Sequence, residues 1–137
     1  MKRYAKAFTG LLAIVAVGMG LPAQAVTCTW KGATGDWFDG NNWTNGVPGN
    51  GDDAIVNSGL VLLTNSTPAL GSLTQGGGDL VFSNWTTALT ATNVYLYGGT
   101  HSTPAAFTAG QMSNRVWIAC TNLFLAAGAR IDVAGKG

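Results

Sequence analysis

The chain has 137 residues, of which 47% are hydrophobic and only 9% are charged, and its formal net charge is +1. Globular proteins ordinarily contain about 25% charged residues, so this composition excludes a coiled coil, a charged helical bundle and a basic nucleic-acid-binding domain. High apolar content with almost no net charge also excludes a disordered tail. The 20 glycines and the many threonines and asparagines favour a β-rich extracellular protein.

Residues 1–25 have the three parts of a secretory signal peptide. Three basic residues stand within the first six positions, an apolar run follows to Leu21, and the small-residue sequence Ala23-Gln24-Ala25 ends the segment. We therefore predict export through the Sec pathway, cleavage after Ala25, and a secreted or cell-surface location. The alternative is an uncleaved anchor, because the uncharged stretch between Lys6 and Lys31 is long enough to span a bilayer.

Cleavage after residue 25 leaves four basic residues against six aspartates, a net charge of −2. Such a chain lacks the positive charge that binds a phosphate backbone, so we predict no nucleic-acid partner. No later segment is apolar over a spanning length, so we predict no membrane contact after cleavage. We also predict no cofactor, because the sequence has neither a Walker loop nor a Rossmann glycine motif in a βαβ pattern.

Residues 26–53 are predicted to form an N-terminal cap. Trp30, Trp37 and Trp43 stand close together and are joined by Gly, Asn and Asp, a pattern that does not fit a regular strand. The first coil of a stacked β-structure has an open core and unpaired strand edges, which must be covered. We expect the three tryptophans to provide that cover.

Residues 54–137 are predicted to form short strands separated by glycine turns such as Gly76–Gly78, since glycine accepts a positive φ without strain. The apolar, β-prone runs are Ala54–Val56, Leu60–Leu63, Asp79–Phe82, Asn93–Tyr97, Val116–Ala119, Asn122–Leu125 and Arg130–Val133.

These runs recur along the chain. Residues 89–99 align with residues 118–128 at an offset of 29, and a weaker copy beginning at Ser72 lies 21 residues before Asn93. Spacings of about twenty to thirty residues suit a solenoid with corner loops of varying length. We therefore predict an all-β fold, a short right-handed parallel β-helix of about four to five coils, with a β-sandwich as the alternative.

The alternation of side chains along a strand predicts which residues face the core. In the two best-matched repeats, Tyr95 and Phe124 are expected to face outward. The residues expected to face inward are Val94, Leu96, Leu123 and Leu125.

The cap and the run after it carry a distinctive series of motifs, namely Trp30-x-Gly32, Gly35-Asp36-Trp37, Asn42-Trp43, Gly46-Val47-Pro48 and Gly51-Asp52-Asp53-Ala54-Ile55-Val56. This series resembles the opening motif of secreted bacterial β-solenoid proteins of the autotransporter-passenger and adhesin-like kind. The resemblance implies a surface, adhesive or structural role and a chain that is the N-terminal part of a longer protein. Gln75 departs from it, because such repeats usually place an apolar inward residue there.

No catalytic constellation stands out, so the chain is predicted not to be an enzyme; a fragment of a polysaccharide-active β-helix enzyme is the second alternative. His101 stands alone in a segment flanked by Gly and Pro and is expected to be a solvated loop residue. The aspartate pairs of the cap are expected to cap turns. A weak calcium candidate comprises Asp36, Asp39 and Asn41, whose side chains offer hard oxygen ligands.

The first alternative function is a small carbohydrate-binding module, in which Trp43, Trp85, Tyr95 and Tyr97 stack on sugar rings of surface glycans. The competing interpretation is that the cap tryptophans are buried and the tyrosines form a ladder between neighbouring strands.

Two further features bear on assembly. An oxidising destination permits a disulfide between Cys28 and Cys120, but in a stack of coils these residues lie several rungs apart, which favours two separate thiols. The last run, residues 130–137, leaves an open coil through which the chain is expected to self-associate or to continue.

Overall fold

The computed structural model describes residues 24–105 and 115–136, so most of the predicted signal peptide lies outside the described residues. Within these ranges the chain is all-β apart from one short 3-10 helix, η1 (Gly40–Asn42). The strands are β1 (Thr27–Thr29), β2 (Thr34–Asp36), β3 (Asp53–Val56), β4 (Leu60–Leu63), β5 (Leu70–Gln75), β6 (Asp79–Phe82), β7 (Leu89–Leu96), β8 (Gly99–Ser102), β9 (Ile118–Leu125) and β10 (Ala129–Ile131).

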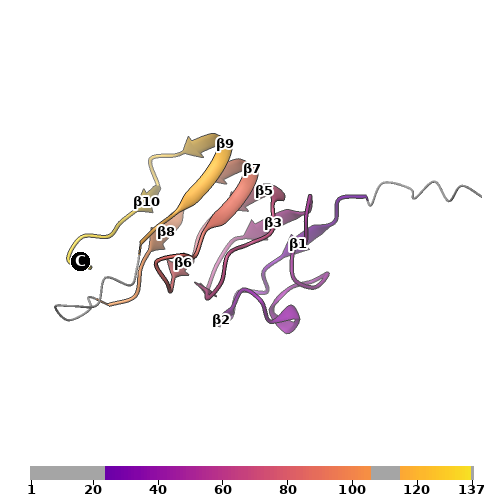
Figure 1. Ribbon diagram of the computed structural model, residues 1–137, viewed down its shortest axis with the longest axis horizontal. Helices are drawn as coiled ribbons and strands as arrows, with labels where there is room; N and C mark the ends of the chain where they lie inside the picture. The colour runs from indigo at the N-terminus through magenta and orange to yellow at the C-terminus, as the bar shows by residue number, and fades with distance from the viewer. Residues whose placement is uncertain (1–23, 106–114, 137) are drawn as a thin grey trace, which may run out of the picture.

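The strands form two parallel five-stranded sheets (Figure 1). One sheet has the order β1-β3-β5-β7-β9, which we call sheet A, and the other has the order β2-β4-β6-β8-β10, which we call sheet B. The chain therefore alternates between the sheets, and each strand from β3 onward pairs with the strand two places earlier. The strands β9 and β10 are the last of their sheets in the described part of the chain.

The strands with the clearest alternation were predicted well. The structure has β4 and β6 at the expected bounds, and β3 begins one residue earlier than expected, at Asp53. Burial alternates along β3 and β4, as it must in strands with one face in the core.

The prediction of two separate runs near residues 116–125 was wrong. They form the single strand β9, which pairs with β7 from Leu89↔Ile118 to Leu96↔Leu125. This pairing has the same 29-residue offset as the sequence alignment, and Ser72↔Asn93 in β5 and β7 has the 21-residue offset. Pairing along the whole of β7 extends β9 through the polar residues that interrupted the apolar run.

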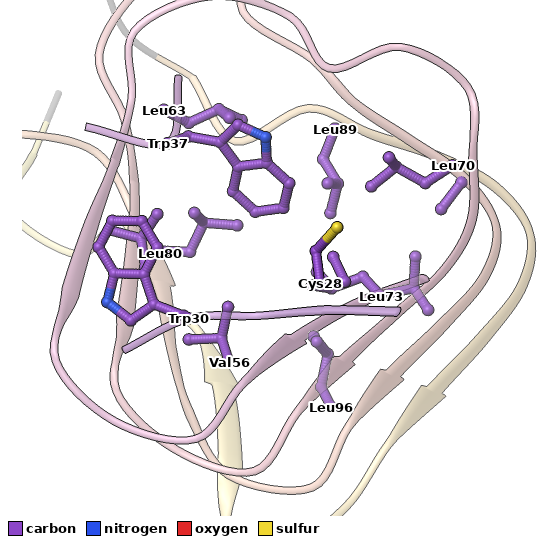
Figure 2. Packing of buried hydrophobic residues seen from close by; sticks show 14 of the residues in the cluster. Cys28, Trp30, Trp37, Val56, Leu63, Leu70, Leu73, Leu80, Leu89 and Leu96 are labelled. Atoms are coloured by element: carbon purple, nitrogen blue, oxygen red, sulfur yellow. The ribbon is translucent and has the colours of Figure 1, made fainter. Parts of the chain in front are cut away.

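Inner side chains of both sheets form one hydrophobic core. Val56, Leu73 and Leu96 of sheet A are buried with Leu63 and Leu80 of sheet B. Figure 2 shows these side chains pointing into the common interior between the strands. The core thus lies between the two sheets.

The residues predicted to face inward are buried on β7 but exposed on β9. Val94 and Leu96 are fully buried, as expected. Leu123 and Leu125 occupy the matching register positions on β9, yet each is 49% exposed. Their register agrees with the expected inward orientation, but they are exposed because β9 is the last strand of its sheet in the described structure and no further described strand covers them.

Candidate functional site

The three tryptophans of the predicted cap form one buried cluster. The ring centroids of Trp30 and Trp43 lie 5.1 Å apart and those of Trp37 and Trp43 lie 4.7 Å apart, both edge to face. Trp43 Nε1 donates a hydrogen bond of 2.7 Å to the Trp37 carbonyl. All three side chains are buried, as in the interpretation that competed with sugar stacking. The alternative prediction that Trp43 is exposed and stacks on sugar rings is therefore wrong.

The segment from 26 to 53 also contains β1 and β2, although a regular strand was not expected there. Residues after η1 hydrogen-bond along the outer edge of β1. Thr44 N–H donates to the Thr29 carbonyl at 3.0 Å, and Asn45 Nδ2 donates to the Thr27 carbonyl at 2.8 Å. These bonds occupy edge groups that could otherwise pair with another strand.

The other three residues proposed for sugar stacking are exposed or half-buried but are not gathered in one place. Tyr95 lies near the end of β7 and Tyr97 directly follows the strand, and their nearly parallel rings have centroids 6.5 Å apart. Trp85 precedes the opposite end of that strand. The Arg115 guanidinium carbon lies 4.7 Å from the Trp85 ring centroid and 4.0 Å from that of Trp117, so it covers one face of Trp85.

The carboxylates of the calcium candidate serve as hydrogen-bond acceptors within the fold. Asp36 accepts from Phe38 N–H at 2.7 Å and from Thr64 Oγ1 at 2.7 Å. Asp39 caps η1 by accepting from Asn41 N–H at 2.9 Å. Across residues 24–105 and 115–136, no group of three or more His, Cys, Asp or Glu side chains gathers as metal ligands would.

The second aspartate pair also holds local structure. Asp52 accepts from Val26 N–H at 2.8 Å and from Gly49 N–H at 2.7 Å. These two backbone donors, Val26 first, hold the pKa of Asp52 below its ordinary value. Asp53 accepts from Ser72 Oγ at 2.6 Å. The expected capping of backbone groups is thus seen for Asp36, Asp39 and Asp52, whereas Asp53 accepts from a side chain of the neighbouring strand.

The position of His101 differs most from what the sequence predicted. It lies on β8 rather than in a loop, and it is 1% exposed rather than solvated. Its Nε2 contacts Gln75 Oε1, and Gln75 Nε2 donates to the Gly78 carbonyl at 2.9 Å. The polar side chain of Gln75, which is also buried, therefore faces inward and serves as the partner of the histidine.

Burial lowers the pKa of His101 from 6.5 to about 4. The unfolded chain thus takes up a proton at a higher pH than the folded chain. The free energy of unfolding should therefore be highest above about pH 6.5. It should fall by about 3 kcal/mol as the pH falls toward 4, because the unfolded chain is protonated first. Urea unfolding at a series of pH values measures this decline. The variant His101→Leu, although less stable throughout, should show a much smaller decline between pH 6.5 and 4.5, because it lacks the buried imidazole.

The two cysteines are separate thiols in the structure, the arrangement that the sequence favoured over a disulfide. Both are free thiols, with Cys28 buried on β1 and Cys120 half-buried on β9, at opposite ends of sheet A. Four strand spacings separate β1 from β9, or about 19 Å, whereas a disulfide needs Cα atoms within about 7 Å. Burial, and after it the charge of Asp52, raises the pKa of the Cys28 thiol.

A pocket of about 320 Å³ opens between the first halves of β5, β7 and β9. Its walls are mostly apolar and threonine side chains such as Leu70, Ala91 and Thr92, with the thiol of Cys120. This set of side chains contains neither a general base nor a pair of carboxylates.

In the part of the chain that the structure describes, no helix has the length and apolar character needed to cross a membrane. Comparisons of the chain with protein-family models, with curated protein sequences and with solved structures found no significant match.

Proposed function

We propose that this chain is an exported, non-enzymatic β-solenoid segment with a surface, adhesive or structural role, and that it is the N-terminal part of a longer protein. The observation that carries the proposal is the contrast between its two ends. The β1 end has a buried tryptophan cluster and an edge with hydrogen-bond partners, whereas the β9/β10 end exposes inward-register apolar side chains.

The alternation of the chain between two parallel sheets supports the solenoid. A parallel strand cannot follow its neighbour through a tight hairpin, because the chain must first return to the starting end. Here each return passes through one strand of the other sheet. Five strand pairs, from β1/β2 to β9/β10, then correspond to five successive coils, right-handed as parallel crossovers are. A β-sandwich, the alternative, is ordinarily built from antiparallel strands.

The hydrogen bonds of the acidic residues support a role other than catalysis. Asp36, Asp39 and Asp52 hold backbone N–H groups near the capped end. His101 is enclosed in the core with Gln75. A general acid or base needs access to its substrate, and a histidine buried among core residues does not have it.

The open end has the character of an interface for a further coil. Leu123, Leu125 and Ile131 stand in register with buried residues of the preceding strands, and they are 49%, 49% and 42% exposed. A further coil, with one parallel strand added to β9 and one to β10, would pair with the outer edges of these strands and would cover the three side chains. In the longer protein we assign that place to the coil that follows residue 137.

Residues 26–137, isolated so that this end is uncovered, are expected to self-associate. Sedimentation velocity should show the association increasing with protein concentration. The double substitution Leu123→Lys and Leu125→Lys should keep the chain monomeric, because two charges would have to be buried in the contact. Leu62→Lys, which places a charge on the outer face of β4, is the matched control and should leave association unchanged.

Intact-mass measurement of the native secreted product tests the other half of the proposal. A mass well above that of residues 26–137 is the expected result. A mass equal to that of residues 26–137 would contradict the proposal that the chain is part of a longer protein. Association that is unchanged by the two lysine substitutions would contradict the proposed interface at β9.

A further inference from the structure

The outer face of sheet A carries three aromatic rings in contact. Tyr95 and Tyr97 are two residues apart and their ring planes are inclined by only 15°, with centroids 6.5 Å apart. The ring of Phe124, whose residue pairs with Tyr95 in the sheet, lies 5.4 Å from the ring of Tyr97. Tyr97 is 53% exposed and Phe124 is 49% exposed. The three rings therefore form a continuous apolar surface that solvent reaches.

Amide side chains run beside these rings. Asn93 and Asn122 form the register pair two residues before Tyr95 and Phe124, and residues two apart on a strand share a face. Asn122 Nδ2 donates to Asn93 Oδ1 at 2.8 Å. This bond uses one polar atom of each amide. The structure gives the second polar atom of each amide no partner among the described residues, so both remain available to a ligand.

Both rows continue across the sheet with small and mostly neutral side chains. The amide row continues through Ser72 to Asp53, and the aromatic row continues through Thr74 to Ile55. Asp53 is the one charged residue in these two rows from β3 to β9, and Ser72 Oγ donates to its carboxylate. The face is thus an aromatic strip beside a hydrogen-bonding strip with little charge.

We propose that this face of sheet A binds a neutral polysaccharide. The C–H groups on the face of a sugar ring pack against aromatic rings, and its hydroxyl groups bond to amides that can both donate and accept. A surface with almost no positive charge offers little to a polyanion. Because the rows run across the strands, an extended sugar chain lying along them contacts several strands at once. The proposal is independent of what covers the β9/β10 end.

Native electrophoresis in gels containing a polysaccharide tests the proposal. The probes are four neutral polymers, laminarin, xyloglucan, galactomannan and dextran, and two charged ones, pectate and alginate. At least one neutral polymer should retard the chain more than the charged polymers do. Tyr97→Ala and Phe124→Ala should each weaken this retention about tenfold, since each removes a ring that packs on the sugar.

Trp85→Ala is the matched control, because it removes an exposed aromatic ring at the opposite end of β7. It should be retained as the unmodified chain is. Circular dichroism confirms that each variant is folded. Retention by none of the neutral polymers would overturn the proposal. Retention by the charged polymers alone, or a loss of retention in Trp85→Ala but not in Tyr97→Ala, would overturn it as well.

Discussion

Replacing Trp43 by alanine should lower the free energy of unfolding by about 3–5 kcal/mol, the usual cost of removing a buried tryptophan. Its ring is 1% exposed and packs edge to face against both Trp30 and Trp37. The substitution empties the centre of the cluster and also removes the hydrogen bond to the Trp37 carbonyl. Urea denaturation followed by circular dichroism measures the loss.

Trp85→Ala is the comparison for this prediction, because Trp85 is 43% exposed. It should cost less than about 1 kcal/mol, mainly through the lost contact with Arg115. Equal losses in the two variants would show that the cluster of Trp30, Trp37 and Trp43 does not close the β1 end. The same pair of variants separates two residues that the sequence presented alike, as asparagine-tryptophan-threonine triplets.

The second large effect is expected at a glycine turn. Gly78 has a φ of +75°, and a Cβ added there would lie 2.5 Å from the Gly59 carbonyl oxygen of the adjacent turn. Gly78→Ala should therefore cost at least about 3 kcal/mol, combining the left-handed backbone with a contact against rigid main chain. Because this turn precedes β6, the backbone shift would also disturb the β4–β6 pairing. Thermal unfolding and urea titration measure the cost.

Gly51 provides a matched control for the backbone contribution alone. Its φ is +82°, but an added Cβ would meet nothing within 4 Å. Gly51→Ala should therefore cost only about 1–2 kcal/mol. If Gly78→Ala proved no more costly than Gly51→Ala, close stacking of successive turns would not be a constraint on this fold.

Local pattern predicted the strands that bury alternate side chains. Both β4 and β6 lie at their expected bounds, because a period of two between glycine turns depends only on neighbouring residues. The offset between residues 89–99 and 118–128 likewise equals the register of β7 with β9. Identical side chains at equivalent positions favour the same pairing, so the repeat in the sequence already contained the register.

Gln75 and His101 show where local pattern failed. Gln75 looked misplaced as a polar residue at an inward position, and His101 was expected to be a solvated loop residue between glycines and a proline. They are 26 residues apart, on β5 of sheet A and β8 of sheet B, and their side chains meet in the core that the two sheets enclose. A buried polar group is tolerated when it finds a partner, and that partner is not visible in the local sequence.

The aromatic and amide face of sheet A was predicted only in part, because its residues also come from strands far apart in the sequence. Tyr95 lies on the outer face, as its alternation with Val94 and Leu96 suggested, and Tyr97 is exposed beside it. Phe124 was expected to face outward but was not expected to join them, and Asn93 and Asn122 were not expected to form a polar row beside them. Only the register of β7 with β9 places these five residues together.

Short stretches of the sequence are enough to predict the β-rich character of the protein, many of its glycine turns and the spacing of its repeated strands. These properties follow from backbone preferences and side-chain alternation over a few neighbouring residues. Which aromatic rings are buried, which strand edges find hydrogen-bond partners and which polar groups meet became clear only from the packing of the two sheets. Those outcomes depend on hydrogen bonds and packing between strands about twenty to thirty residues apart, whose partners are set only when the two sheets enclose their common core.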